Sequence, residues 1–356
     1  MLKYTQKSSF QKINHLPQHT LLLEAKTVEA SENSVCYFPL EKGRYEVKPG
    51  FIPLGASLGN GEADKRVFQF DGNFTHYRHI KLLCRAERLG KYYQTCNYSN
   101  AVAGAIARLI VERLSQEYPH WFCCQTTING TAFHNQLTGE TLYLDSNWQL
   151  EKVQTQGEPV FPPYISTLDA LATQVQEDMT VMSRSVDGRH WLSAVHLCYP
   201  NHWSAEEKIG QDFTTIHAPV AGMEKINHRA NAIVNTMIVR KPMIRFAWGL
   251  STDTRLNHHP EPPLGVPLDE WHGRSFNRNN PQLLLRIERQ VIWGLPEHDA
   301  SLFTIRTYFR DCTVIKQDPM LRSKLSAALG SMTPESLLYK GLAESREEIL
   351  AWLEED

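Results

Sequence analysis

The order of β-rich and helix-like stretches between residues 177 and 310 most constrains how this chain can fold. The runs MTVMSRS and RHWLSAVHL are joined at Asp187-Gly188, a dipeptide typical of two-residue hairpin turns. Helix-like segments follow. Three more β-rich runs cover residues 243–250, 283–295 and 301–309. The order β-β-α-α-β-β-β predicts an α+β fold with a five-stranded antiparallel sheet that carries helices on one face.

We expect the chain to divide into three parts. Residues 171–315 form the core, whose order of elements is PAS-like, and domains of that kind hold a ligand between helices and sheet. Residues 1–170 form an N-terminal extension, partly helical and partly irregular, that covers the second face of the sheet. Residues 316–356 form a tail of short helices, in which Thr333-Pro334 is a favourable N-cap and N1 pair.

Within the extension, the clearest helix begins near Ser99, where apolar residues recur at near-helical spacing until Pro119 ends the pattern. Strand-like pieces at residues 20–25 and 34–40 precede it, and a hairpin candidate around Thr138-Gly139 follows it.

Composition excludes several classes of protein. The chain is 42% hydrophobic and has a net charge of −2 with histidine neutral, which argues against broad, non-specific nucleic-acid binding. No apolar run reaches the length of a membrane span, and the first twenty residues lack the apolar segment of a secretory signal, so we expect a cytoplasmic protein. The seven cysteines are scattered without a CxxC pair, so no zinc knuckle or iron–sulfur site is expected within the chain.

Charged residues recur on the predicted strands. They are Arg245, Arg286, Glu288, Arg289 and Arg306. A solvated polar face of an amphipathic sheet would account for any one of them. If the extension covers the second face of the sheet, however, these residues become enclosed and must pair with one another or act chemically.

His217 is the histidine with the most distinctive surroundings. It lies between Ile216 and an Ala-Pro-Val-Ala run, just ahead of a helix-like stretch at 223–239. A satisfied core or turn histidine and a ligand to a metal or haem both fit this position. His228, within the following helix, is the main rival for a ligand role. We expect His196 and His202 to be structural, and His258 and His259 to be solvated in a Pro-rich loop.

Three stretches of this chain resemble one known family. They are RHWLSAVHLCYPNHWSAEEKIGQDFTTIHAPVAG at 189–222, IRFAW at 244–248 and LLLRIERQVIWGLPEHDASLFTIRTYF at 283–309. These stretches resemble the family of the haem-dependent oxidative N-demethylase α subunit, and VFQFDGNFTHYRHIKLLCRAERL fits its upstream part loosely. The resemblance covers residues 50–312. Asn201, Ala221 and Ala247 depart from the family pattern, which has Ser, Pro and Asn there.

The resemblance implies a PAS-like domain that binds haem b and oxidises a small amine with O2, with electrons from a redox partner protein that carries flavin and an iron–sulfur cluster. It implies His217 as the ligand of the haem iron. Lys208 is then a candidate partner of a haem propionate and Trp203 a candidate packing residue, although a solvated lysine and a core tryptophan fit these positions as well.

The catalytic candidates follow from the same resemblance. A fixed cation in a dry site stabilises negative charge that develops on bound oxygen. Arg245 is the first choice because it lies on the first strand after the helices, and Arg306 and Arg289 follow. Glu288 is expected to pair with the amine cation or to carry protons. No nucleic acid and no membrane is expected as a partner.

Two other classes of function stay open from the sequence. One is a non-catalytic PAS-like haem sensor of gas or redox state, which would need an output domain that the roughly forty residues after 312 do not suggest. The other is a haem-free module that binds a different small molecule.

Overall fold

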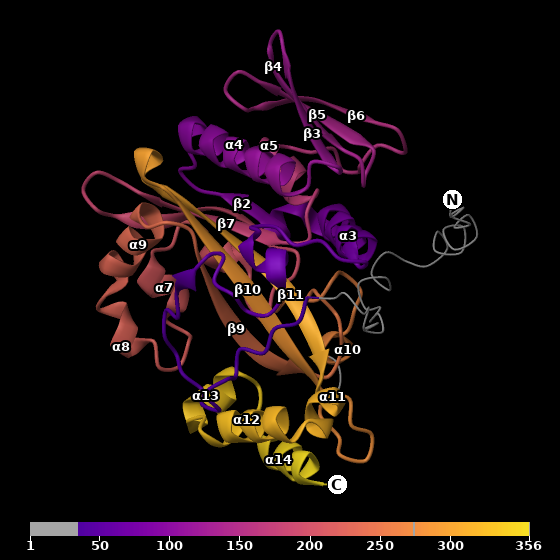
Figure 1. Ribbon diagram of the computed structural model, residues 1–356, viewed down its shortest axis with the longest axis vertical. Coiled ribbons are helices and arrows are strands. Elements are labelled where there is room, and N and C mark those ends of the chain that lie inside the picture. The colour runs from indigo at the N-terminus through magenta and orange to yellow at the C-terminus, as the bar shows by residue number, and fades with distance from the viewer. Residues whose placement is uncertain (1–34, 273–274, 356) are drawn as a thin grey trace.

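The computed structural model describes residues 35–272 and 275–355 as a mixed α/β fold with two antiparallel sheets (Figure 1). The larger sheet has seven strands in the order β1-β9-β10-β11-β7-β8-β2, and the smaller has four in the order β3-β4-β5-β6. The prediction of an α+β fold with antiparallel pairing is confirmed. The expected count of five strands in the main sheet is wrong.

The five expected strands all form, and they are neighbours in the larger sheet. They are β7 (Asp178–Arg184), β8 (His190–His196), β9 (Met243–Ser251), β10 (Leu284–Leu295) and β11 (Ala300–Asp311). Two short strands from the N-terminal part extend the sheet: β1 (Ile52–Pro53) pairs with β9, and β2 (Tyr93–Thr95) pairs with β8. They cover part of the edges that β9 and β8 would otherwise expose. Pieces of two and three residues are too short to show an alternating pattern in the sequence.

The turns within the sheet follow the sequence signals. Gly188 takes a positive φ of 87° in the hairpin between β7 and β8, where its amide donates a hydrogen bond to the Ser185 carbonyl and the Ser185 amide donates one to the Arg189 carbonyl. This is a three-residue loop that ends in a left-handed glycine, one residue longer than a two-residue turn. β10 and β11 are joined by a short 3-10 helix, η2 (Pro296–His298), and by Asp299 in the left-handed region.

Four short helices between β8 and β9 cover one face of the larger sheet, which we call the α9 face. They are α6 (Ala205–Lys208), α7 (Phe213–His217), α8 (Glu224–Asn227) and α9 (Ala230–Val239). Buried Phe213, Val234 and Met237 of these helices pack with Ile292 of β10. Gly294 allows α9 to approach β10, because a Cβ there would clash with the Ile238 carbonyl. The single helix expected at 223–239 is instead two helices, α8 and α9, which are separated by residues 228–229.

The other face of the sheet, which we call the α4 face, is covered from both ends of the chain. At one end of the sheet lie α4 (Asn100–Glu117) and α5 (Thr167–Ala172), which pack on Ile244 and Val291. At the other end lie the C-terminal helices, which pack on Leu285 and Ile287 (Figure 1). The C-terminal helices are α11 (Cys312–Gln317), α12 (Pro319–Gly330), α13 (Pro334–Tyr339) and α14 (Arg346–Glu354). The division into extension, core and tail stays a prediction.

The expected caps are present in these helices. The Ser99 side chain accepts a hydrogen bond from the Val102 amide at the start of α4, and Thr333 accepts one from the Ser336 amide at the start of α13. Residues 35–40 form no strand, contrary to expectation, and the strand-like piece at 20–25 lies outside the described residues.

The remaining elements lie around the larger sheet. They are η1 (Gly61–Lys65), α3 (Phe74–Tyr92), α10 (Leu268–His272) and the four-stranded sheet of β3 (Phe122–Thr127), β4 (Gly130–Asn135), β5 (Glu140–Asp145) and β6 (Leu150–Thr155). The small sheet lies beyond α4 at the top of Figure 1.

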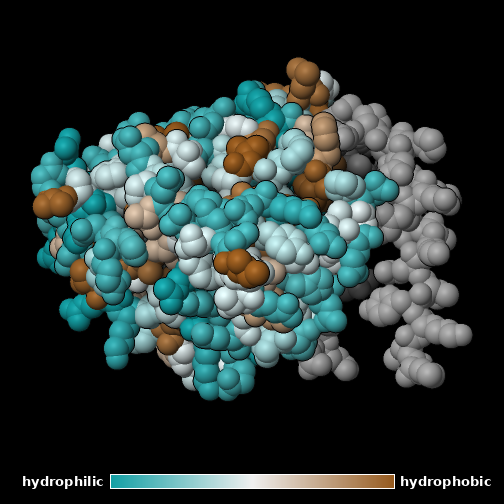
Figure 2. Space-filling view, turned by 90° about the horizontal axis from the view of Figure 1, so that it is seen from above, coloured by the Kyte–Doolittle hydropathy of each residue, from teal (hydrophilic) through white to brown (hydrophobic). Residues whose placement is uncertain are grey.

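The surface seen in Figure 2 is largely hydrophilic, with hydrophobic residues in small separate spots. Among the described helices, none combines the length and the apolarity that crossing a bilayer requires.

Candidate functional site

His217 is the last residue of α7, a helix that begins because the Asp212 carboxylate accepts a hydrogen bond of 2.7 Å from the Thr215 amide. The His217 Nδ1 lies 2.7 Å from the Phe213 carbonyl oxygen. A carbonyl oxygen only accepts hydrogen bonds, so Nδ1 carries the proton and Nε2 holds the lone pair of the neutral ring. Burial, together with the positive charges of Arg245 and Lys208, lowers the pKa of His217 to about 4, although the bond to Phe213 opposes this shift. The ring is therefore neutral at pH 7.

The positive charge of Arg245, on β9, acts on the His217 ring. One nitrogen of Arg245 also lacks a hydrogen-bond partner within the part of the chain that the structure describes. Its Nε is closed to solvent and has no hydrogen-bond partner among the described residues. Burial lowers the pKa of Arg245, and the negative charge of Glu288 only partly opposes this. Gln290, its direct cross-strand partner on β10, has a buried Oε1 that also lacks a partner in the described part of the chain. Buried polar groups are normally satisfied, so this pair on the α9 face points to something that binds there.

Glu288 lies one row further along the same face of β10, opposite Ala247. One of its carboxylate oxygens, Oε2, accepts a hydrogen bond of 3.0 Å from Gln290 Nε2. The other, Oε1, lies 4.0 Å from Arg286 Nε. The carboxylate is thus held in place between two side chains of its own strand, on the face where Arg245 lies.

The C-terminal helices add two groups to this region that no sequence motif predicts. Lys340, directly after α13, donates a hydrogen bond of 2.9 Å from Nζ to the Trp248 carbonyl of β9. Burial lowers the pKa of Lys340, while the charge of Glu288 acts in the opposite direction. Burial and the charge of Glu288 both raise the pKa of Tyr339. Neither residue belongs to a motif, so only the packing of α13 against the sheet reveals them.

Lys208 and Trp203 come from the α6 region. The Ser204 hydroxyl accepts a hydrogen bond from the Glu207 amide and caps α6, as expected from the sequence. Lys208 ends this helix, and its charge contributes to the low pKa of His217. Trp203 is partly buried in an apolar cluster that also includes Ile216, the residue before His217. Both side chains therefore lie in the neighbourhood of His217.

Arg289 and Arg306 are cross-strand partners on the α4 face, so the sheet separates them from Arg245. Arg289 donates a hydrogen bond of 2.8 Å to the Arg66 carbonyl. Arg306 donates one of 2.7 Å to the Asp71 carboxylate. The structure does not bring these two arginines together with His217. Their contacts attach the chain around residues 66–71 to the sheet.

The other histidines differ in their surroundings. His228, the rival ligand, is exposed at the end of α8. His258 and His259 were expected to be solvated, and that prediction is wrong, since they are 9% and 3% exposed. His258 Nε2 lies 3.0 Å from an Asp253 oxygen, and Trp271 donates a hydrogen bond of 2.6 Å to the His259 carbonyl. The Pro-rich loop therefore packs against α10 instead of extending into solvent.

A family model described as haem-dependent oxidative N-demethylase, alpha subunit-like, matches residues 60–350. This chain belongs to that family. The match includes His217, Arg245, Glu288 and Lys340, and it extends through α11–α13, beyond the stretch that the sequence motifs cover.

The residues around His217 fit the haem that the family name implies. A histidine that ligates a metal usually donates its other ring nitrogen to a carbonyl or carboxylate, which fixes the tautomer and the ring orientation. His217 does so through Nδ1, and no described residue hydrogen-bonds to its Nε2. Arg245 Nε and Gln290 Oε1 add two buried polar atoms without a hydrogen-bond partner among the described residues. This donor set suits an iron-bound cofactor better than it suits a closed apolar core.

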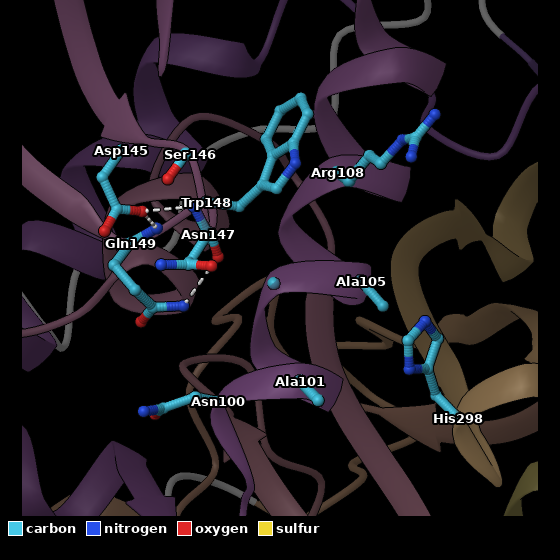
Figure 3. A pocket seen from close by; sticks show the side chains of 11 residues that line it. Asn100, Ala101, Ala105, Arg108, Asp145, Ser146, Asn147, Trp148, Gln149 and His298 are labelled. Atoms are coloured by element: carbon cyan, nitrogen blue, oxygen red, sulfur yellow. Dashed lines mark hydrogen bonds between the residues drawn. The ribbon is translucent and has the colours of Figure 1, made fainter. Parts of the chain in front are cut away.

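Two surface cavities are lined by other residues. The larger, of about 680 Å³, lies between α4 and the turn from β5 to β6, where Arg108, Trp148 and His298 line it (Figure 3). The smaller, of about 300 Å³, is lined by residues that include Phe51, Lys225 and Arg229. Neither contains a residue predicted from the sequence to act in catalysis or binding.

Proposed function

We propose that this chain is the haem-binding catalytic subunit of an oxidoreductase that removes a methyl group from a small amine with O2. One observation carries the proposal: His217 Nδ1 is fixed by the Phe213 carbonyl, which leaves Nε2 available as a ligand, and Arg245, whose charge acts on this ring, has a buried Nε without a partner among the described residues. Membership of a family named for haem-dependent oxidative N-demethylation supports it. The reaction balances when the N-methyl amine, O2, two electrons and two protons give the shorter amine, formaldehyde and water.

Bound haem b would supply the redox-active iron, with electrons delivered by a partner protein that carries flavin and an iron–sulfur cluster. His217 would hold the iron through Nε2. The hydrogen bond to Phe213 raises the basicity of the ring as a ligand, and the low pKa keeps its lone pair free of protons at neutral pH. Lys208 would offset the negative charge of a propionate, and Trp203 would pack beside the cofactor.

Arg245 would stabilise the negative charge that develops when oxygen is reduced. Arg245 Nε is already closed to solvent and has no partner among the described residues, so the side chain needs little reorganisation to do this. Glu288, oriented by Gln290, would pair with the ammonium form of the amine and accept its proton before the N-methyl carbon is oxidised. Lys340, held by its bond to the Trp248 carbonyl, would provide a fixed countercharge to Glu288.

The architecture proposed for this function has three parts. Residues 171–315 form the PAS-like haem core, with β1 and β2 added at its edges. Residues 1–170 form the extension over the α4 face, and residues 316–356 form the tail that supplies Lys340. We propose that the protein works in the cytoplasm with a redox partner, and without a nucleic-acid or membrane partner.

An absorption spectrum of the full-length protein, made with a haem precursor, tests the proposal. We expect a Soret band that shifts on reduction with dithionite and again with carbon monoxide. The His217→Ala variant should lose haem, and the His228→Ala variant should keep it, since His228 is exposed at the end of α8. Formaldehyde release from N-methyl amines, with an added electron donor, then tests the reaction. A protein that stays colourless despite haem supply would remove the proposal, and a haem protein inert towards amines would favour a sensor.

A further inference from the structure

A second group of metal-ligating side chains lies in the core, apart from His217. Asp178 is the first residue of β7, His196 is the last residue of β8, and Cys198 follows two residues later. One ligand atom from each of the three lies within 4.8 Å of the others. All three side chains are 0% exposed. A thiol, an imidazole and a carboxylate that converge in a closed core match the donor types that zinc prefers.

The Asp169 carboxylate fixes the orientation of the His196 ring. Its Nε2 lies 3.3 Å from Oδ1 of Asp169. Arg85 in turn clamps Asp169 with two hydrogen bonds of 2.8 Å, from Nε and Nη2. The other ring nitrogen, Nδ1, faces Cys198 Sγ. A histidine that ligates zinc usually has one ring nitrogen hydrogen-bonded to a carboxylate, which orients the ring, while the other nitrogen binds the metal. Asp169 and Nδ1 of His196 fit these two roles.

The spacing of these atoms suits a tetrahedral ion. Zinc bonds of about 2.3 Å to sulfur and about 2.0 Å to nitrogen place the two ligand atoms roughly 3.6 Å apart at a tetrahedral angle. The separation of His196 Nδ1 and Cys198 Sγ is 3.9 Å. A small movement of either side chain closes this difference.

The Asp178 carboxylate is also held in a defined direction. Its oxygens accept hydrogen bonds of 2.9 Å and 2.7 Å from the amides of Cys198 and Tyr199. Each carboxylate oxygen keeps a further lone pair for a metal. A carboxylate and a thiolate together offset the two charges of a zinc ion, which limits the cost of burying it. The positive charge of buried Lys81 also acts on Asp178 and Cys198, and the charge of Glu177 acts on Lys81 in turn.

We propose that His196 Nδ1, Cys198 Sγ and the Asp178 carboxylate bind a structural Zn²⁺ ion. Such an ion would join the ends of β7 and β8 and, through Asp169 and Arg85, connect them to α5 and α3. The nearest further thiol is Cys84, whose Sγ lies 3.7 Å from the Cys198 carbonyl oxygen, and it is the candidate for the fourth position. The sequence gives no sign of this site, because its ligands come from two strands and not from a CxxC pair.

Metal analysis of the full-length protein, purified without chelators, tests the proposal directly. We expect about one zinc per chain, counted separately from haem iron. X-ray absorption at the zinc edge should show sulfur at about 2.3 Å and nitrogen or oxygen at about 2.0–2.2 Å. Zinc that is absent, even after refolding with added zinc, would overturn the proposal, as would zinc without a sulfur neighbour. The three side chains would then form an ordinary core hydrogen-bond network.

A matched pair of variants locates the ion. Cys198→Ser should lose zinc, whereas Cys312→Ser should keep it, because Cys312 is an equally buried thiol at the start of α11. Zinc retained in Cys198→Ser would overturn the assignment. His217→Ala should lose haem and keep zinc, so that failure of the haem proposal and failure of the zinc proposal are distinguishable. If Cys198→Ser does not fold, the X-ray absorption of the unaltered protein decides.

Discussion

Arg245 and Gln290 face each other across β9 and β10, and each has a buried polar atom without a partner among the described residues. The two side chains are an unmet donor and an unmet acceptor on the face that α7–α9 cover. Leaving such groups unsatisfied costs free energy of folding, typically about 1–3 kcal/mol each. A ligand that forms hydrogen bonds with these two atoms would recover that free energy when it binds.

Replacement of Arg245 should therefore lower activity without lowering stability. We expect Arg245→Ala to retain haem and to lower kcat by about 10²–10³, the usual effect of removing one preorganised charge-stabilising group. Its melting temperature should stay the same or rise, because the variant removes a buried Nε that has no hydrogen-bond partner among the described residues. Steady-state kinetics and thermal unfolding measure the two effects. A large fall in melting temperature would show that Arg245 is a structural residue.

Arg306 should behave in the opposite way. Its side chain is 1% exposed and holds Asp71 and the Gln69 carbonyl. Arg306→Ala removes these bonds, and we expect it to lower the free energy of unfolding by about 3 kcal/mol, the lower end of the range for breaking a buried ion pair, since Asp71 keeps some access to water. Urea unfolding measures this loss. An Arg306→Ala protein of unchanged stability and reduced turnover would place Arg306 in catalysis instead.

The contrast between these arginines shows how far the sequence could predict the site. Strand alternation places Glu288 and Arg289 on opposite faces of their strand, and the structure has them so. It cannot say which cation finds a partner, because the partners of Arg289 and Arg306 are backbone carbonyls and a carboxylate more than 200 residues away. Long-range packing decides which arginine stays unpaired.

The fold shows the same limit. The five central strands and their hairpins follow from β-rich runs and turn residues, which act locally. The two edge strands and the position of Lys340 do not, since each depends on a distant segment that meets β9 or β8. Contacts between segments so far apart in the sequence form only in the folded chain, so no local pattern predicts them.

Glu288→Gln tests whether the carboxylate recognises the amine. The amide keeps the size of the side chain but loses the charge that would pair with an ammonium group. We expect haem content to stay the same and KM for the amine to rise at least about tenfold, which corresponds to about 1.4 kcal/mol of binding. Lys340→Met is the companion variant, because it removes a nearby positive charge and should not raise KM for a cationic substrate. Equal KM values for Glu288→Gln and the unaltered protein would argue against this role.

The depressed pKa of His217 predicts an unusual dependence of haem binding on pH. An ordinary histidine, with a pKa near 6.5, would begin to lose iron to protons below about pH 6.5. His217, with a pKa of about 4, should bind haem equally well from pH 8 to about pH 5. Titration of the haem-free protein with haem, followed by Soret absorbance at each pH, measures the affinity. A tenfold loss of affinity per pH unit that starts near pH 6.5 would contradict the assignment.

The same pKa has a consequence for the stability of the haem-free protein. Between pH 6.5 and pH 4 the unfolded chain binds a proton at His217 and the folded chain does not, so this residue makes folding less favourable as the pH falls. His217→Gln removes the titrating group. Relative to that variant, the unaltered protein should lose about 2–3 kcal/mol of unfolding free energy between pH 7 and pH 4. Urea unfolding of both proteins at each pH measures the difference, and parallel curves for the two would show that the His217 ring is not held in its neutral form by burial.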